Sequence, residues 1–320
     1  MGAVPSASDR VACVSVDLDE IHHYAAIHGL AAPALERASE ARLACTVGLE
    51  RALAWAREEQ IPLTLFVVAA DLDEPRVRAL LSRALDEGHE VASHSLTHPY
   101  DLVHRSGAEL EREVSGSFER IAARLGVRPR GFRAPGYLVC EAMFDALERA
   151  GASYDASILT APVYDLAKMA AMASMRLAGR SSRASLGDRA VWRAPTEAYR
   201  PGRSPYALGA RRLVEIPMTV TRIARLPIIG TTLGLLGPRL APRLVRAAGA
   251  PRSFSLELHA IDFLDTGDGL EALRGHQPEL TRPLSVRHAA LRAGVAELRR
   301  ESYGFATLAE LAASFGASGA

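Results

Sequence analysis

The sequence predicts a single α/β domain built around a mostly parallel sheet. From residue 11 onward, short apolar runs alternate with longer stretches that carry apolar residues at helical spacing. Such alternation is typical of repeated strand–helix units, in which helices cover parallel strands. A chain of 320 residues with 48% hydrophobic residues can bury a sizeable core, and no linker divides it into two domains.

Strands and helices alternate regularly through the first half of the chain. Apolar runs predict strands at 11–19, 63–68, 89–92 and 131–133. Helical spacing predicts helices at 31–59, 74–87, 107–125 and 141–150. The last of these helices is expected to stop at Gly151, because glycine commonly terminates a helix.

The second half of the chain is less regular. We expect a Met-bearing helix at 166–177, loops at 178–210, a regular pattern again at 213–217, a strand at 254–259, and a last unit at 285–300, 305–307 and 308–315. These elements place an N-terminal tail at 1–9, one domain at 10–316 and an irregular insertion at about 160–212.

Composition excludes several classes of protein. The formal net charge of +1 argues against a dedicated nucleic-acid binder. The three cysteines lie too far apart in sequence for a zinc knuckle or a redox motif, and structural disulfides are not expected. The first ten residues have neither the basic nor the apolar region of a secretory signal, so we expect a cytoplasmic protein.

A markedly apolar segment at about 223–251 has two interpretations. Its unbroken apolar part is too short to span a bilayer, which needs about 20 residues. It is either a loop and helix of the core, or a lid or interfacial element that contacts lipid or an acyl chain. The second interpretation predicts liposome association through Leu233, Leu235 and Leu236, and hence peripheral contact with a membrane.

A histidine pair and an aspartate pair suggest a metal site. His94 and His98 follow a short apolar run and could converge on one ion if the backbone turns helically between them. Asp17 and Asp19 end the first strand and point to the same side, so that one could bind metal while the other acts as a base. Taken alone, the histidines could be a surface pair and the aspartates a cap or loop anchor.

Five segments, in order and over almost the whole chain, resemble the motifs of the polysaccharide deacetylases with NodB-like homology, carbohydrate esterase family four. They are Ser15–Asp19, His94–Pro99, Phe132–Tyr137, Tyr154–Ser157 and Leu258–Phe263. Leu18 separates the two aspartates, which are adjacent in the commonest pattern. This spacing is similar to the cytosolic branch that includes the undecaprenyl-phosphate aminoarabinose deformylase.

The resemblance implies a distorted (β/α) barrel with its site at the carboxyl ends of the strands. It implies one divalent metal ion held by Asp19, His94 and His98. Zinc is the favoured ion, although cobalt, manganese and iron(II) also fit such ligands.

The resemblance also implies roles in acid–base chemistry. Asp17 would act as the base, Arg133 would hold Asp17, and His259 would protonate the departing amine. The backbone N–H near Tyr137 would help to stabilise the oxyanion. Alternatively, Arg133 braces a turn and His259 is a core histidine.

Further residues are candidates for substrate binding. Tyr137, Pro135, Trp192 and Asp262 form this group. Trp192 could equally pack in the core, and Asp262 could orient His259 or merely cap the following turn.

Three more histidines, His22, His23 and His28, are expected in a loop at the mouth of the site. They either contact substrate there or are simply solvated.

The expected function is metal-dependent removal of an N-acetyl or N-formyl group from an amino sugar. The substrate is a small molecule or a lipid-linked amino sugar at the cytoplasmic face of the membrane. One alternative is a non-catalytic binding or regulatory protein on a deacetylase scaffold, and another is hydrolysis of a non-sugar amide. The sequence does not indicate the oligomeric state.

Overall fold

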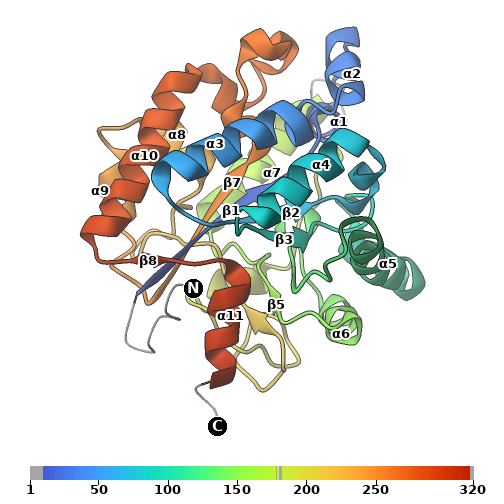
Figure 1. Cartoon of the computed structure of the whole chain (residues 1–320), viewed down its shortest axis with the longest axis vertical. Helices are drawn as coiled ribbons and strands as arrows, with labels where there is room; N and C mark the ends of the chain where they lie inside the picture. The colour runs from blue at the N-terminus through green and yellow to red at the C-terminus, as the bar shows by residue number, and fades with distance from the viewer. Residues whose placement is uncertain (1–9, 178, 180–181, 318–320) are drawn as a thin grey trace.

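The computed structural model describes residues 10–177, 179 and 182–317, and it confirms the predicted α/β fold (Figure 1). The predicted tail at 1–9 lies outside the described residues. Every pairing between named strands in the described part is parallel. The strands are β1 (Val11–Asp17), β2 (Leu63–Val67), β3 (Glu90–Ser93), β4 (Gly131–Phe132), β5 (Tyr154–Asp155), β6 (Val214–Glu215), β7 (Ser253–His259) and β8 (Gly304–Phe305).

The sheet has the order β6-β5-β4-β3-β2-β1-β7, and β8 also pairs with β1. Its two ends come together beyond β6. There the N–H of Met218 donates to Ile158 O at 2.9 Å, and the N–H of Thr219 donates to Ser255 O of β7 at 3.0 Å. The sheet therefore curls into the distorted barrel that was predicted, and the carboxyl ends of the strands meet at one end of it.

Helices cover the outside of the strands, as Figure 1 shows for α3, α4 and α5. They are α1 (Ile21–His28), α2 (Pro33–Glu40), α3 (Leu49–Glu59), α4 (Pro75–Asp86), α5 (Gly107–Leu125), α6 (Glu141–Ala150), α7 (Pro162–Leu177), α8 (Gly230–Leu236), α9 (Ala241–Arg246), α10 (Leu284–Arg300) and α11 (Leu308–Ala317). The main core lies between β1, β2 and β7 and the helices on that side.

Local sequence explains where several elements begin and end. All seven residues of β1 are buried because the strand lies between β2 and β7, which accounts for its nearly continuous apolar run. At the start of α5, Ser106 and Glu109 form a capping box. Helix α6 ends at Gly151, which adopts the left-handed conformation with φ 86°, as predicted.

The single helix predicted at 31–59 is wrong, because the chain changes direction within it. Helix α2 ends at Glu40, Arg42 has a φ of 50°, and a π-helical turn at Ala44–Gly48 leads into α3. The buried carboxylate of Glu20 accepts N–H bonds from Ala44 and Cys45 at 3.2 Å each and from Ile21 at 2.8 Å. One side chain therefore caps both α1 and the turn before α3.

The expected loop around His22, His23 and His28 is also wrong, since these residues lie on α1. This short helix is fixed at its start by Glu20 and ends at Gly29, whose φ is 60°. His23 is thereby buried, whereas His22 is exposed.

The apolar segment at 223–251 packs into the core in part, whereas Ile223 is 96% exposed and Leu226 and Leu240 are 38% and 40% exposed. Helices α8 and α9 pack against α10, and α8 also contacts β7. Leu233 is fully buried, so the expectation that it contacts lipid is wrong, while Leu235 and Leu236 are 36% and 39% exposed. No helix within the described residues is both long and apolar enough to cross a membrane.

Candidate active site

Asp17 is the last residue of β1 and Asp19 lies two residues further on, and both point to the same centre, as the strand period predicted. Asp17 lies beside His259 in the register of β1 and β7. Its Oδ2 is 4.0 Å from His94 Nε2, and Asp19 Oδ1 is 3.0 Å from the same nitrogen. Both aspartates are buried, at 0% and 5% exposure.

The two histidines converge through a tight loop and not through the helical turn that was predicted. Ser95 and His98 have positive φ values of 69° and 59°, which non-glycine residues rarely adopt. Side chains stabilise this strained loop. Ser95 Oγ accepts the N–H of His98 at 2.9 Å, and the Glu113 carboxylate accepts both the N–H and the hydroxyl of Thr97 at 2.9 and 2.7 Å.

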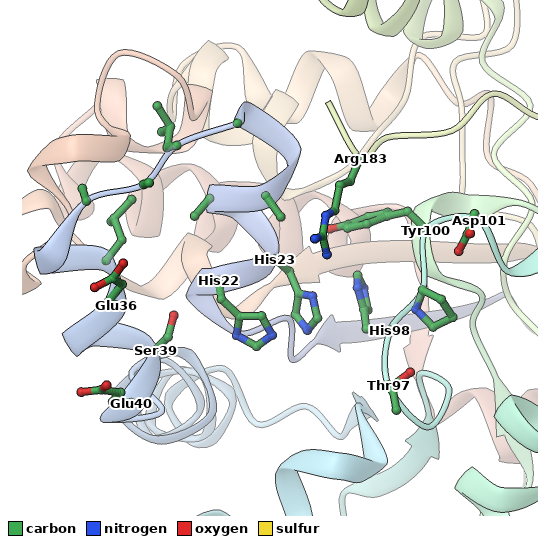
Figure 2. A pocket seen from close by; sticks show the side chains of 18 of the residues that line it. His22, His23, Glu36, Ser39, Glu40, Thr97, His98, Tyr100, Asp101 and Arg183 are labelled. Atoms are coloured by element: carbon green, nitrogen blue, oxygen red, sulfur yellow. The ribbon is translucent and has the colours of Figure 1, made fainter. Parts of the chain in front are cut away.

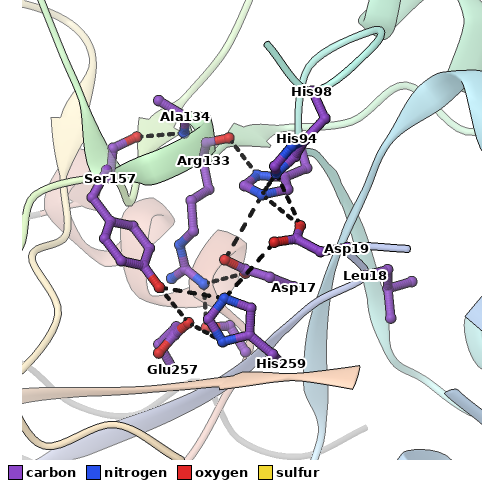
Figure 3. A network of polar contacts seen from close by, with 12 residues as sticks. Asp17, Leu18, Asp19, His94, His98, Arg133, Ala134, Ser157, Glu257 and His259 are labelled. Atoms are coloured by element: carbon purple, nitrogen blue, oxygen red, sulfur yellow. Dashed lines mark hydrogen bonds and ion pairs between the residues drawn. The ribbon is translucent and has the colours of Figure 1, made fainter. Parts of the chain in front are cut away.

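Asp19, His94 and His98 present three ligand atoms to one point (Figure 3). Asp19 Oδ1 lies 3.0 Å from His94 Nε2 and 3.1 Å from His98 Nε2, and the two nitrogens are 3.2 Å apart. His94 Nδ1 is 2.7 Å from the carbonyl oxygen of Arg133, so it carries the ring proton and Nε2 presents a lone pair.

This arrangement passes a simple test for a metal site. When both imidazoles are neutral, Asp19 Oδ1 and the two Nε2 atoms all present lone pairs to one another. Their separations of 3.0–3.2 Å are those of hydrogen bonds, yet no proton lies between them. Asp19 Oδ1 has no hydrogen-bond donor among the described residues. When His98 and His94 are protonated instead, their charges outweigh the effect of burial and lower the pKa of Asp19 well below its usual value. A cation is therefore what the group fits, and two imidazoles with one carboxylate are ligands that zinc and similar ions accept.

Arg133 holds Asp17 in place, as predicted. Its Nη1 donates to Asp17 Oδ1 at 2.6 Å and to Ser15 Oγ at 2.9 Å, and its Nε donates to Ala156 O at 2.8 Å. Arg133 is fully buried, with its guanidinium 4.2 Å from the centre of the Phe66 ring. The contact with Ala156 also braces the chain after β5, so the contacts agree with both interpretations of this arginine.

The second oxygen of Asp17 is available to the reaction centre. Oδ2 is buried and has no hydrogen-bond partner in the described part of the chain. Burial raises the pKa of Asp17, and the charges of Arg133 and His94 oppose this rise. The carboxylate thus has one oxygen fixed by Arg133 and one free to accept a proton.

His259 is paired with Glu257, a residue that the sequence interpretation missed. His259 Nδ1 donates to Glu257 Oε1 at 2.8 Å, and the Tyr137 hydroxyl donates to the same oxygen at 2.8 Å. His259 Nε2 then faces the centre, 3.9 Å from Asp19 Oδ2. Burial lowers the pKa of His259, but Glu257 outweighs burial and, with Asp17 and Asp19, raises this pKa well above its ordinary value.

Asp262 caps the turn after β7 and does not orient the imidazole. Its Oδ2 accepts the backbone N–H of His259 at 2.9 Å, within the 3-10 turn Ala260–Phe263. Of the two interpretations of Asp262, capping is the one that the contacts support. Its contacts give no support to its prediction as a substrate-binding residue.

The other predicted substrate-binding residues, Pro135, Tyr137 and Trp192, differ in whether they reach the centre. Pro135 is buried at the start of the 3-10 turn Pro135–Tyr137, which brings the Tyr137 hydroxyl to the centre. The backbone N–H of Tyr137 donates to Ala134 O at 3.1 Å. This N–H is therefore already paired, and the structure does not show it in the oxyanion contact that was expected. Trp192 donates its indole N–H to Asp165 of α7 at 2.6 Å, which makes it a support for that helix.

Two further tyrosines were not foreseen. The hydroxyls of Tyr24 and Tyr100 are buried, and neither has a hydrogen-bond partner within the described ranges. Burial raises the pKa of both phenols, and the nearby Asp19 carboxylate raises it further. The Tyr24 ring lies 6.3 Å from the His259 ring and the Tyr100 ring 4.7 Å from the His98 ring, so both flank the centre.

A cavity of about 1170 Å³ adjoins the candidate metal-binding group on the side of α1 and α2 (Figure 2). His98 and Tyr100 line its inner end, and the exposed His22 lines its outer part. His23 lies between them, with its ring 3.9 Å from that of His22 and 4.1 Å from that of His98. This cavity gives a ligand of considerable size a place next to the centre.

Residues 46–154 match the family model described as polysaccharide deacetylase, which confirms the predicted family resemblance. The match includes His94, His98 and Arg133, whereas the two aspartates and His259 lie outside it. The special similarity to the cytosolic deformylase branch is not tested by this match.

Solved structures resemble almost the whole chain. A Mycobacterium smegmatis protein assigned as a polysaccharide deacetylase has a TM-score of 0.61 at 19% identity, covering 99% of this chain and 94% of that one. The Puue allantoinase has a TM-score of 0.59 at 17% identity, and a Pseudomonas aeruginosa PAO1 protein assigned as a polysaccharide deacetylase has 0.58 at 15%. Each of these two comparisons covers 97% of this chain and 91% of the other. Likeness at such low identity establishes the fold.

Metal binding is the first test of the site. We expect the purified protein to bind one divalent ion, measured by elemental analysis, and its unfolding temperature to rise on addition of zinc because the ion binds only the folded state. Asp19→Ala and His98→Ala should lose both the ion and the zinc-dependent rise.

His22→Ala is the matched control, since this imidazole is close to the site but outside the ligand group. It should bind the ion like the unmodified protein. Full metal content in Asp19→Ala would contradict the assignment of the ligands.

Proposed function

We propose that this chain, with its match to the polysaccharide deacetylase family, is a metal-dependent hydrolase that removes an acyl group from the nitrogen of an amino sugar. The observation that carries the proposal is the meeting of three groups at one buried centre. These are the ligand group Asp19, His94 and His98, the pair Asp17–Arg133, and the pair Glu257–His259.

The side chains supply an acid and a base for hydrolysis. When bound, a divalent ion supplies Lewis-acid polarisation of the amide carbonyl and eases deprotonation of water. Asp17 Oδ2 accepts the proton of the attacking water, while Arg133 keeps the carboxylate oriented. The water oxygen forms a new bond to the carbonyl carbon, the C–N bond breaks, and His259 Nε2 donates a proton to the leaving amine.

Glu257 makes His259 suitable as the acid. The ion pair of 2.8 Å between Glu257 and His259 favours the imidazolium and fixes which nitrogen faces the centre. The pairs Asp17–Arg133 and Glu257–His259 thus favour opposite protonation states. Asp17 must be ionised to act as the base, whereas His259 must be protonated to act as the acid.

The proposed substrate is an N-acetyl or N-formyl amino sugar, and the proposed ion is zinc. Lipid linkage and a cytoplasmic location remain predictions from the sequence. The alternative of a non-catalytic protein has less support, because acid, base and metal ligands are all present together. Hydrolysis of a non-sugar amide remains a second candidate, favoured by the likeness in fold to an allantoinase.

An assay of amine and acid release tests the function. Metal-loaded protein should release acetate or formate from at least one member of a panel of N-acylated amino sugars and non-sugar amides. Asp17→Asn should lower kcat by about 10²- to 10⁴-fold, because the base is lost, and should leave the metal content unchanged. Equal activity in Asp17→Asn would contradict the proposed base, and activity on non-sugar amides alone would favour the second candidate.

Glu257→Gln tests the source of the acid. Loss of the carboxylate removes what raises the pKa of His259, so this pKa falls. Because the protonated imidazole is required, the decline of kcat at high pH should begin at a lower pH than in the unmodified protein. Asp262→Asn, which touches only the backbone N–H of His259, should leave that limb of the pH profile in place. An unshifted profile in Glu257→Gln would rule out this positioning role.

Tyr24→Phe and Tyr100→Phe test whether the two unpaired hydroxyls bind substrate. Each change should lower kcat/KM by about 3- to 10-fold, as expected for one lost hydrogen bond. Neither should lower the unfolding temperature, because no protein partner within the described residues loses a bond. Tyr303→Phe is a contrasting control, since its hydroxyl donates to Pro251 O at 2.6 Å and its loss should affect stability alone. Unchanged kinetics in both variants would remove the tyrosines from the site.

A further inference from the structure

Helix α7 carries apolar residues on its exposed face as well as on its inward face. Its exposed positions include Val163 at 48%, Leu166 at 54% and Leu177 at 91% exposure and the alanines at 167, 170 and 173, beside the polar Ser174 and Arg176. Its inward positions are half-buried or buried and include Tyr164, Met169, Met172 and Met175 together with the polar Asp165 and Lys168. A helix that is apolar on both sides is normally buried, so the exposed apolar face of α7 requires an explanation.

The sequence of α7 and of the segment after it is rich in positive charge. The stretch 162–193 contains six basic residues and two acidic ones, a net charge of +4, although the whole chain has a net charge of only +1. Arg176, Arg183, Arg189 and Arg193 are exposed. The two acidic residues are engaged locally, Asp165 with the Trp192 indole and Asp188 with the N–H of Ala190.

We propose that α7, with the exposed arginines Arg176, Arg189 and Arg193, docks onto an anionic lipid bilayer. An apolar helix face flanked by arginines lies in the interfacial region of a membrane, where the apolar side chains enter the acyl boundary and the cations meet the headgroups. A second copy of this chain is a poorer occupant. A symmetric pair formed through this face would bring two patches of the same positive charge together.

The position of α7 links this surface to the candidate active site. Tyr164, in the first turn of α7, has its ring 6.1 Å from that of Tyr137, and the Tyr137 hydroxyl contacts Glu257. Docking through α7 would therefore place the membrane next to the reaction centre. Delivery of a lipid-anchored substrate there rests on the proposed function, whereas the docking itself does not.

Co-sedimentation with vesicles tests the docking without an activity assay. The full chain should sediment with vesicles of phosphatidylcholine and phosphatidylglycerol, and much less with phosphatidylcholine alone or at high salt. Leu166→Glu should lower the partition coefficient by about tenfold or more. Ala170→Glu should lower it as well, because this alanine lies on the same exposed face.

A matched control tests whether the effect is specific to α7. Ala79→Glu introduces the same charge at an exposed alanine of α4 and should leave binding unchanged. Thermal unfolding of each variant checks that it is folded.

The proposal is overturned if the unmodified protein does not sediment with anionic vesicles, or if both α7 variants bind as it does. Binding that Leu235→Glu on α8 abolishes and Leu166→Glu preserves would also overturn it. So would light scattering that shows a dimer which Leu166→Glu converts to monomer.

Discussion

The buried guanidinium of Arg133 is the group on which the polar centre depends. Its side chain fixes Asp17 and Ser15 of β1 and the carbonyl of Ala156 after β5, while its own carbonyl fixes the ring of His94. One residue therefore orients both the proposed base and a metal ligand. A fully buried charge is tolerated only when it is paired, and the Asp17 carboxylate at 2.6 Å supplies the pairing. The same contact connects the chain after β4 with the end of β1.

The centre contains many buried polar atoms that have no hydrogen-bond partner within the described residues. Buried atoms without a hydrogen-bond partner, in the part of the chain that is described, include Asp17 Oδ2, Asp19 Oδ1, His98 Nδ1, Arg133 Nη2, Glu257 Oε2 and the hydroxyls of Tyr24 and Tyr100. Native proteins pair nearly all such groups because an unpaired one costs free energy of about 1–3 kcal/mol. Their concentration around one point indicates that ligands, and not the protein, complete the network.

The strands and the main candidate residues could be predicted because they follow simple periods. Strand alternation placed Asp17 and Asp19 on the same side, and the same rule would have found Glu257, two residues before His259 on β7. The conformation of His94–His98 could not be predicted, since positive φ at Ser95 and His98 depends on side-chain bonds to Ser93 and Glu113. Tyr24 and Tyr100 reach the centre from α1 and from the loop after His98, and no local pattern marks them.

Helices α7 and α8 show why apolar composition alone does not locate an exposed apolar surface. The segment containing α8 is the more apolar in sequence, but the curled sheet and α10 cover its central residue, Leu233. Helix α7 follows β5, and its inward side chains include the buried Met175 and Asp165, which the Trp192 indole engages. Which face of a helix is exposed is thus decided by what the fold places beside it. In α7 the residues Val163, Leu166 and Leu177 are exposed, while the ring of Tyr164 lies 6.1 Å from that of Tyr137 in the candidate active site.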